Sequence, residues 1–273
     1  MLALILTILT LSVLTVASYV DFRTREVPDW LSYAFVAAAI GIRAIFSVEQ
    51  GGLLLGEGVA GAVIFLSVGY LFYRTRQWGG GDTKLFMGLG AVIGIPFSFT
   101  LASLKPFWYF ILLFLAGAIY GLLYLGLVAL RHHKVVGKEL RETLQAWKTL
   151  QGGVWIAAGF FLLLGFASLY FLPLAVLPPL LFYLFLSLDV IEKSCFVRWI
   201  APQQATEGDW LAKPVFSKGK VLMARKTLDK DDILFLETRT KRIAVKDGIP
   251  FVPSFLLAFA AYLLTPPFVG IIL

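Results

Sequence analysis

The chain has little cysteine, histidine or charge. It contains a single cysteine, Cys195, and two histidines in 273 residues. One thiol excludes an internal disulfide and any zinc site built from several cysteines. Charged residues make up 15% of the sequence, whereas soluble globular domains usually carry about 25%. The scarcity of charge therefore excludes an ordinary soluble domain.

Long apolar runs take the place of the missing charge, and 59% of the residues are hydrophobic. A helix needs about 20 residues to cross the hydrocarbon core of a bilayer. We expect spans at 2–20, 30–46, 51–73, 85–104 and 107–130, two within 154–188, and a last one at 249–273. The sequence thus predicts an all-α polytopic membrane protein with about eight transmembrane helices, within a range of six to eight.

The run at 154–188 is too long for a single crossing, since its roughly 35 residues would measure about 52 Å as one helix. Pro173, Pro178 and Pro179 offer places to interrupt it, because proline removes a helical hydrogen bond. We therefore expect two short helices with a tight turn near Pro173. A re-entrant hairpin is the alternative, and it leaves the sidedness of later segments unchanged.

The basic residues predict the orientation in the membrane. All but two of the 24 lysines and arginines fall on one side of the expected spans, and the exceptions are Arg43 and Lys105. The basic side is cytoplasmic by the positive-inside rule, so the N-terminus is expected outside a plasma membrane. The net charge of +7 then reflects topology, and no nucleic-acid partner is expected. No basic residue precedes the first run, which we interpret as a mature helix rather than a signal peptide.

Five regions are expected along the chain. They are a five-helix membrane core with both aspartates at 1–130, a basic cytoplasmic linker at 131–153, an additional hairpin at 154–190, a small cytoplasmic subdomain at 191–248 and a last helix at 249–273. The subdomain is predicted to be α+β, with strands at 220–225 and 242–245. Thr227 or Asp229 is expected to cap a helix that ends at Glu237.

Two aspartates stand at the ends of predicted spans. Asp21 directly follows the first run and Asp82 directly precedes the fourth. Two crossings separate them, so both are expected at the cytoplasmic edge of the membrane. Two carboxylates in a confined site share a proton, because both do not ionise easily. Such a pair can activate water against a peptide bond without metal or cofactor. The sequence therefore contains a candidate catalytic dyad.

Simpler, structural interpretations exist for the charged residues near the predicted spans. A juxtamembrane aspartate often caps a helix or pairs with arginine, and Asp29 is expected to cap the second span. Glu57 lies inside the third span, nearer its outer end, and we interpret it as structural. Lys84 can pair with an aspartate or hold a lipid phosphate, and the sequence does not decide between them.

Three glycines, Gly79, Gly80 and Gly81, precede Asp82. Glycine adopts backbone conformations that other residues avoid and lets another chain approach closely. We expect this triplet to be a poor helix and a good floor for an extended peptide, which it would bind by strand-like hydrogen bonds.

Both aspartate regions resemble one family. Residues 21–31 read Asp-Phe-Arg-Thr-Arg-Glu-Val-Pro-Asp-Trp-Leu, and residues 79–85 read Gly-Gly-Gly-Asp-Thr-Lys-Leu, followed by further spaced glycines. These segments resemble the type IV prepilin peptidases and archaeal preflagellin peptidases, which are membrane aspartyl proteases of the Gly-x-Gly-Asp class. The resemblance implies that Asp21 and Asp82 are catalytic. It also matches Gly79, Gly81 and Lys84 to fixed positions around the second aspartate.

The resemblance implies the substrates as well. They are pilin-like or archaellin precursors with a short basic leader and an apolar N-terminal helix, cut at the cytoplasmic membrane edge. Glu26 is expected to attract the basic leader, and membrane lipid surrounds the enzyme. The tail is similar to the archaeal branch, which implies an archaeal source. The short first loop lacks the cysteines common in bacterial members, which argues against N-methylation of the product and against zinc.

The alternatives to a peptidase are a transporter and a non-catalytic scaffold. A proton-coupled transporter usually places its carboxylates near the bilayer midplane and between repeats, whereas these aspartates lie at the edge and no repeat is visible. A non-catalytic scaffold of a pilus or archaellum assembly system would tolerate replacement of either aspartate.

Overall fold

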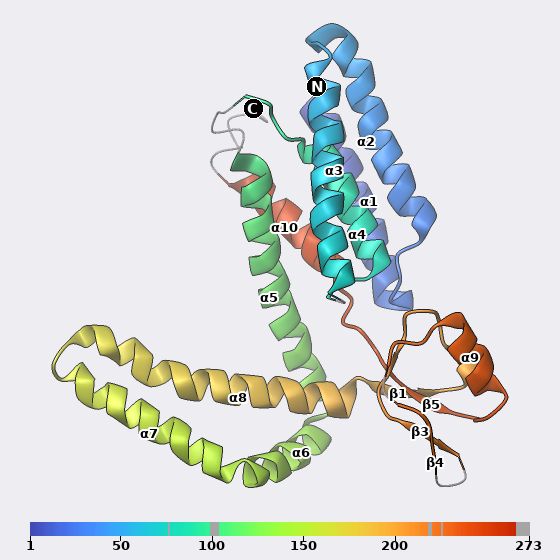
Figure 1. The fold of residues 1–273 in the computed structure, drawn as a ribbon. Coiled ribbons are helices and arrows are strands. Elements are labelled where there is room, and N and C mark those ends of the chain that lie inside the picture. Colours follow the sequence, from blue (N-terminus) through green and yellow to red (C-terminus); the bar gives the residue numbers. More distant parts are fainter. Residues whose placement is uncertain (76, 99–103, 218–219, 225, 266–273) are drawn as a thin grey trace. The chain divides into compact units, whose positions relative to one another are not determined.

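A computed structural model describes residues 1–75, 77–98, 104–217, 220–224 and 226–265. The chain forms two compact units. The core unit consists of Met1–Leu122 and Ile249–Leu273, and the insert unit consists of Leu123–Gly248. The described residues are mainly helical, and strands occur only in the insert unit (Figure 1).

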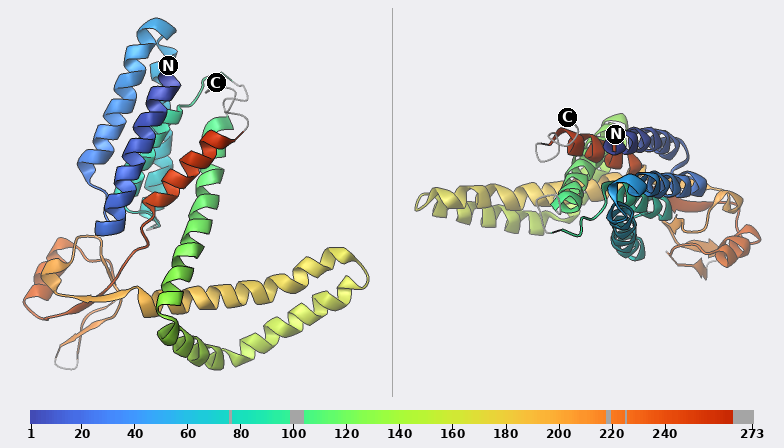
Figure 2. Two further views of the ribbon diagram at one scale, coloured as in Figure 1. Left: turned by 180° about the vertical axis from the view of Figure 1, so that it is seen from behind. Right: turned by 90° about the horizontal axis from the view of Figure 1, so that it is seen from above.

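Helices alone build the described part of the core unit. They are α1 (Leu2–Thr24), α2 (Asp29–Gln50), α3 (Leu53–Arg74), α4 (Gly80–Ile93), the first part of α5 (Lys105–Arg131) and α10 (Val252–Leu264). Helix α4 packs against α2 and α3, and α10 packs against α1 (Figure 2). The last described helix thereby lies beside the first.

Glycines allow α4 to approach its neighbours closely. A Cβ atom added to Gly61 would lie 2.1 Å from the carbonyl oxygen of Gly90, and one added to Gly90 would lie 2.3 Å from that of Gly61. A Cβ on Gly88 would lie 2.2 Å from the ring of Phe35 on α2. Such small-residue contacts are how membrane helices gain close packing. They fix α4 between α2 and α3.

Six helical segments among the described residues are long and apolar enough to cross a membrane. They are α1, α2, α3, α5, and two in the insert unit, α7 (Lys148–Gly165) and the segment Leu169–Cys195. The prediction of an all-α membrane protein with six to eight spans is confirmed. Helices α4 and α10 are shorter, and the predicted spans 85–104 and 249–273 extend into residues 99–103 and 266–273, outside the described residues.

The predicted pair of helices near the prolines is present, but the turn lies earlier than expected. Helix α7 ends at Gly165, a 3₁₀ turn η2 (Leu169–Phe171) follows, and α8 (Leu172–Cys195) begins before Pro173. The turn therefore lies before Pro173 rather than at it. Proline fits the first turn of a helix, because its missing N–H costs nothing there. Pro178 and Pro179 lie inside α8 and do not end it.

The rest of the insert unit is a short helix and a small α+β region. Helix α6 (His133–Ala146) lies between α5 and α7 in the chain. The elements after α8 are β1 (Val197–Ile200), η3 (Pro202–Gln204), β2 (Trp210–Leu211), β3 (Val215–Ser217), β4 (Lys220–Met223), α9 (Lys230–Glu237) and β5 (Ile243–Lys246). One antiparallel sheet has the order β1-β5-β2, and β3 pairs with β4. The predicted α+β subdomain is confirmed, with β4 and β5 at the two predicted strands.

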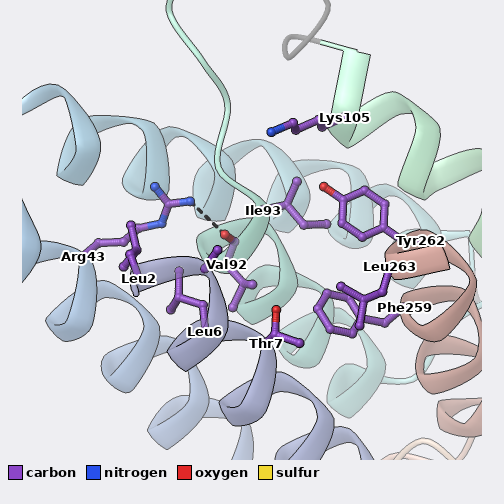
Figure 3. Close-up of a pocket in the computed structure, with 11 residues that line it drawn as sticks. Leu2, Leu6, Thr7, Arg43, Val92, Ile93, Lys105, Phe259, Tyr262 and Leu263 are labelled. Carbon is purple, nitrogen blue, oxygen red and sulfur yellow. Dashed lines mark hydrogen bonds between the residues drawn. The ribbon is translucent and has the colours of Figure 1, made fainter. Parts of the chain in front are cut away.

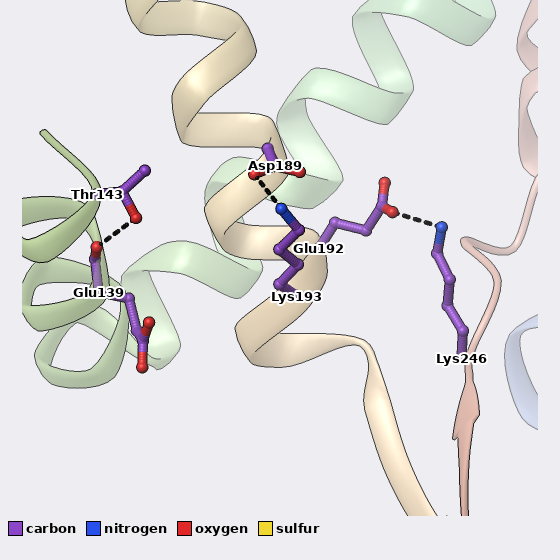
Figure 4. A network of polar contacts seen from close by, with 6 residues as sticks. All are labelled: Glu139, Thr143, Asp189, Glu192, Lys193 and Lys246. Atoms are coloured by element: carbon purple, nitrogen blue, oxygen red, sulfur yellow. Dashed lines mark hydrogen bonds and ion pairs between the residues drawn. The ribbon is translucent and has the colours of Figure 1, made fainter. Parts of the chain in front are cut away.

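Hydrogen bonds and ion pairs stabilise the start of α9 and the end of α8. Asp229 directly precedes α9, and its N–H donates to the Asp232 carboxylate at 3.1 Å. Asp229 rather than Thr227 is therefore the cap of this helix. The Lys246 ammonium pairs with Glu192, which links β5 to α8 (Figure 4). Lys193 pairs with Asp189 one turn earlier on α8, at 2.7 Å (Figure 4).

Candidate active site

Asp21 is a buried carboxylate in the last turn of α1. Its residue is 5% exposed, and its Oδ2 accepts a hydrogen bond of 3.0 Å from the backbone N–H of Val252. We expected Asp21 to follow the first span, but the helix continues to Thr24. Val252 is the first residue of α10. The carboxylate therefore lies at the positive end of a helix dipole, which favours an anion.

The start of α10 explains why that N–H is available. The first N–H groups of a helix have no acceptor within the helix. Pro253 occupies the first turn of α10, where proline is favoured because it lacks the N–H and has a helical φ. The backbone of Val252 is thus fixed in helical geometry with a donor directed at Asp21.

Asp82 is the third residue of α4 and is half-buried. Its Oδ2 accepts a hydrogen bond of 3.0 Å from the backbone N–H of Gly79, the residue that precedes the helix. Asp82 stands before the apolar run that begins at Leu85. Burial, together with the negative charge of Asp21, raises the pKa of Asp82 to about 7, although the hydrogen bond from Gly79 acts in the opposite direction. Asp82 therefore exchanges its proton near neutral pH.

The structure brings the two predicted catalytic residues together. Helices α1 and α4 are in contact, and Asp21 is close enough for its charge to act on Asp82. The loop after α1 also touches α4, since a Cβ on Gly81 would lie only 2.9 Å from the side chain of Val27. The two carboxylates thus belong to one site, formed by the ends of α1, α4 and α10.

An aromatic cluster around Trp78 supports this site, and no pattern in the sequence predicted it. The Trp78 ring stacks on Phe72 of α3 at 4.8 Å between centroids. It also meets Phe86 of α4 at 5.1 Å and Phe255 of α10 at 5.5 Å. Trp78 directly precedes the glycine triplet. Its contacts therefore hold the start of α4 and the start of α10 in one place.

The glycine triplet is more helical than predicted. Only Gly79 is extended, with φ −74° and ψ 164°, and α4 begins at Gly80. The expectation of a poor helix is wrong here, because the Asp82 side chain caps the N–H of Gly79 and Gly81 packs against Val27. The N–H groups of Gly80 and Gly81 lie in the first turn, where the helix offers them no acceptor.

Lys84 pairs with an aspartate, which answers a question the sequence left open. Its ammonium lies 2.5 Å from Asp29 Oδ1 and 5.2 Å from the centre of the Tyr33 ring. Asp29 is the first residue of α2, after Pro28, so the expectation that it caps this helix is wrong. Glu26 lies in the loop between α1 and α2 and is exposed. Among the described residues, no group of three or more His, Cys, Asp or Glu side chains is arranged to hold a metal ion.

Comparison with known proteins points to one family. Residues 8–126, which contain both aspartates, match the type IV leader peptidase family. A preflagellin peptidase from Methanococcus maripaludis is 33% identical over 82 residues, which cover 29% of this chain and 35% of that protein. A prepilin leader peptidase/N-methyltransferase from Vibrio cholerae is 30% identical over 99 residues, which cover 33% of this chain and 39% of that protein.

These similarities are confined to part of each protein. The matched regions span less than two fifths of the length of either curated relative. No solved structure gives a significant match to the chain. The comparisons nevertheless confirm the resemblance carried by the two aspartate motifs: over residues 8–126, this chain matches the type IV leader peptidase family.

Proposed function

We propose that this chain is a membrane aspartic endopeptidase that removes the short basic leader from type IV prepilin-like or preflagellin precursors. The observation that carries this proposal is the carboxylate pair, Asp21 and Asp82, at the adjoining ends of α1 and α4. The names of the two curated relatives support the substrate class. The proposed site of cleavage is the cytoplasmic edge of the membrane, where the distribution of basic residues predicts both aspartates.

The surroundings suggest different roles for the two carboxylates. Asp21 accepts a hydrogen bond from the N-terminus of α10, and such a donor favours the ionised form. Asp82, with a pKa of about 7, holds the proton. Asp21 is then the base and Asp82 the acid, although the apparent pKa values of a coupled pair belong to the pair.

One proton on the pair is enough for peptide hydrolysis. Asp21 takes a proton from water while the water oxygen bonds to the carbonyl carbon, and Asp82 gives its proton to the carbonyl oxygen. The resulting tetrahedral diol collapses as the C–N bond breaks. Asp21 then passes its proton to the leaving amine, and Asp82 takes one from a diol hydroxyl. The products are a carboxylic acid and an amine, and the pair returns to its starting state.

The remaining predicted site residues are proposed to bind substrate. We propose that the first-turn N–H groups of Gly80 and Gly81, next to Gly79, donate to backbone carbonyls of the cleaved segment. Lys84 holds Asp29, and we propose that it shapes this surface rather than contacting the scissile bond. Exposed Glu26 is proposed to attract the basic leader.

Cleavage of a pilin-like precursor in proteoliposomes tests the dyad. The substrate carries a basic leader and an apolar helix, and wild type is compared with Asp21→Asn and Asp82→Asn. Asparagine keeps the shape but cannot ionise, so each variant is expected to lose at least about a hundredfold in rate. Asp29→Asn is the matched control, because it makes the same change at an exposed aspartate, and it is expected to retain cleavage.

Other results would contradict the proposed pair, the peptidase function or the role of Glu26. Normal cleavage by either dyad variant would contradict the proposed pair. If wild-type protein cuts no such precursor although it is folded, a scaffold or a carrier becomes the better explanation. For the leader contact, Glu26→Lys is expected to raise the KM for a basic leader, and an unchanged KM would remove Glu26 from the substrate site.

A further inference from the structure

Arg25, in the loop after α1, holds a backbone conformation that an arginine does not favour. Its φ of 62° and ψ of 17° lie in the left-handed helical region. Among the described residues, the others with a positive φ are all glycines, Gly51, Gly94 and Gly208. A residue with a Cβ atom is strained in this region, whereas glycine is not. Such strain persists only where the surrounding structure maintains it, and it is often found at functional sites.

The path of the chain requires this conformation, whichever residue occupies the position. The N–H of Arg25 donates to the carbonyl oxygen of Asp21 at 2.9 Å and closes the last turn of α1. Two residues later, Val27 packs against Gly81 of α4. The left-handed residue therefore turns the chain out of α1 and toward α4. Glycine or asparagine is the usual residue at such a helix end, so an arginine here is kept at a cost in stability.

Arg43 shows how the core unit holds an arginine whose role is structural. It lies within α2 and is 5% exposed. Its guanidinium donates to the carbonyl oxygens of Leu54 at 3.0 Å and Val92 at 2.8 Å, beside a cavity of about 180 Å³ (Figure 3). Arg25 is exposed instead, so burial of its side chain does not compensate for its backbone strain. Packing therefore does not explain an arginine at this position, which leaves its charge.

The charge of Arg25 reaches the candidate active site. Arg25 follows Asp21 by one helical turn, and its guanidinium interacts electrostatically with the buried Asp21 carboxylate. From α4, the carboxylate of Asp82 acts on Asp21 with the opposite effect. Helix α10 contributes the N–H of Val252 and has no charged side chain. An opposite charge close by favours the ionised form of a carboxyl group, so Arg25 favours a negative charge on Asp21.

We propose that Arg25 is a positioning residue that keeps the negative charge of the proposed dyad on Asp21. This inference rests on the proposed peptidase function, in which Asp21 is the base and Asp82 the acid. Two carboxyl groups that share one proton are equivalent unless their surroundings differ. The charge of Arg25 makes them unequal, and it acts through Asp21 rather than on the peptide bond. The strained backbone is kept because the turn and the charge are needed at the same residue.

Replacement of Arg25 by glycine separates the charge from the turn. Arg25→Gly removes the guanidinium and relieves the backbone, so the unfolding temperature of the full chain in detergent is expected to rise by about 1–3 °C. In proteoliposomes, kcat for a pilin-like precursor is expected to fall about tenfold. KM is expected to stay the same or fall, because the basic leader of the substrate meets one repelling charge fewer. A purely structural residue would instead lose activity only together with stability.

Three further variants complete the test. Arg25→Asn is the second neutral variant, since asparagine also tolerates the left-handed region, and it is expected to lose kcat as Arg25→Gly does. Arg25→Lys keeps both the charge and the strain, and it is expected to retain at least about half of the wild-type kcat. Arg23→Gln is the matched control. It removes the same charge from the last turn of α1, where the guanidinium lies 4.9 Å from the centre of the Tyr19 ring, and it is expected to keep the wild-type kcat.

Several results would overturn the role of Arg25 while leaving the dyad in place. They are a wild-type kcat in Arg25→Gly, an equal loss in Arg23→Gln, and a loss in Arg25→Lys as large as in Arg25→Gly. A lower unfolding temperature that accompanies the lower kcat of both neutral variants would also overturn it, because the role would then be structural. If folded wild-type protein cleaves no precursor, the proposed function fails and this inference fails with it. That result differs from equal cleavage by all variants, which contradicts only the inference.

Discussion

The two ends of the core unit hold opposite charges by the same physical means. At one end, Asp21 accepts a hydrogen bond from the first residue of α10, and Asp82 lies in the first turn of α4. At the other end, Arg43 donates to Val92 in the last turn of α4. Helix dipoles favour anions at their N-termini and cations at their C-termini. Helix α4 therefore supports the acidic end and the basic end at once.

The two ends differ in whether their charge can change. A guanidinium stays protonated in proteins, whereas a carboxyl group exchanges its proton at accessible pH. The positive charge of Arg43 is consequently fixed, and its guanidinium donates hydrogen bonds to two backbone carbonyls. The acidic end keeps a carboxyl group that titrates near neutrality. This difference teaches that burial alone does not distinguish a chemical site from a structural one.

Removal of the fixed charge is expected to have the largest effect on stability. Arg43→Met leaves the half-buried carbonyl oxygen of Leu54 and the buried one of Val92 without their donor, which should cost about 2–5 kcal/mol of unfolding free energy. Arg43→Lys is expected to fall between this variant and wild type. Thermal unfolding in detergent measures the effect. If Arg43→Met unfolds at the wild-type temperature, the basic end contributes no structural support.

The close crossing of α3 and α4 should come next. Gly90→Ala places a methyl group where a Cβ would lie 2.3 Å from the carbonyl oxygen of Gly61. The helices must separate, at a cost of about 1–3 kcal/mol. Gly121→Ala on α5 is the control, since a Cβ there meets nothing within 4 Å, and it should be neutral or stabilising by up to about 1 kcal/mol. Equal unfolding temperatures for both variants would contradict a tight crossing.

The titrating end predicts a pH dependence of cleavage. Asp82 has a pKa of about 7 and must hold its proton to act as the acid. As pH rises through 7 the protonated fraction falls, so the rate should drop about tenfold between pH 6 and pH 8. Initial rates on one substrate, with folding checked at each pH, give the profile. A rate that stays level or rises up to pH 9 would assign the acid role elsewhere.

The smallest effect is expected from the Lys84–Asp29 pair. Its side chains are 27% and 65% exposed, and exposed ion pairs contribute about 0.2–1 kcal/mol. A double-mutant cycle with Lys84→Met and Asp29→Asn should therefore give a coupling energy below about 1 kcal/mol, with cleavage changed by at most about fivefold. A larger coupling, or loss of cleavage on Lys84→Met alone, would mean that Lys84 acts in the reaction.

The sequence was sufficient for the parts of the site that follow from counting and periodicity. The apolar runs give the helices, and the two predicted crossings between Asp21 and Asp82 predict that both lie at one edge of the membrane. Their motifs carry the family resemblance. The Lys84 pairing was one of two alternatives that the sequence left open.

Other features depended on contacts that no local pattern announces. The donor to Asp21 is a backbone N–H at Val252, and a backbone group has no residue signature. Arg43 counted only as a marker of topology, because burial and hydrogen bonding to carbonyls require the folded neighbours. The helical glycine triplet was also missed, since the capping of Gly79 by Asp82 and the packing of Gly81 on Val27 outweigh the low helix propensity of glycine.

The hydrogen bond from Val252 to Asp21 joins residues 231 positions apart. During synthesis, the ribosome makes α1 through α4 long before it makes α10. Until then, Asp21 lacks its backbone donor, and Trp78 lacks its contact with Phe255. The proposed catalytic pair consequently lacks this donor until α10 has been synthesised, and a nascent chain that carries both aspartates but not α10 would not yet have the complete arrangement.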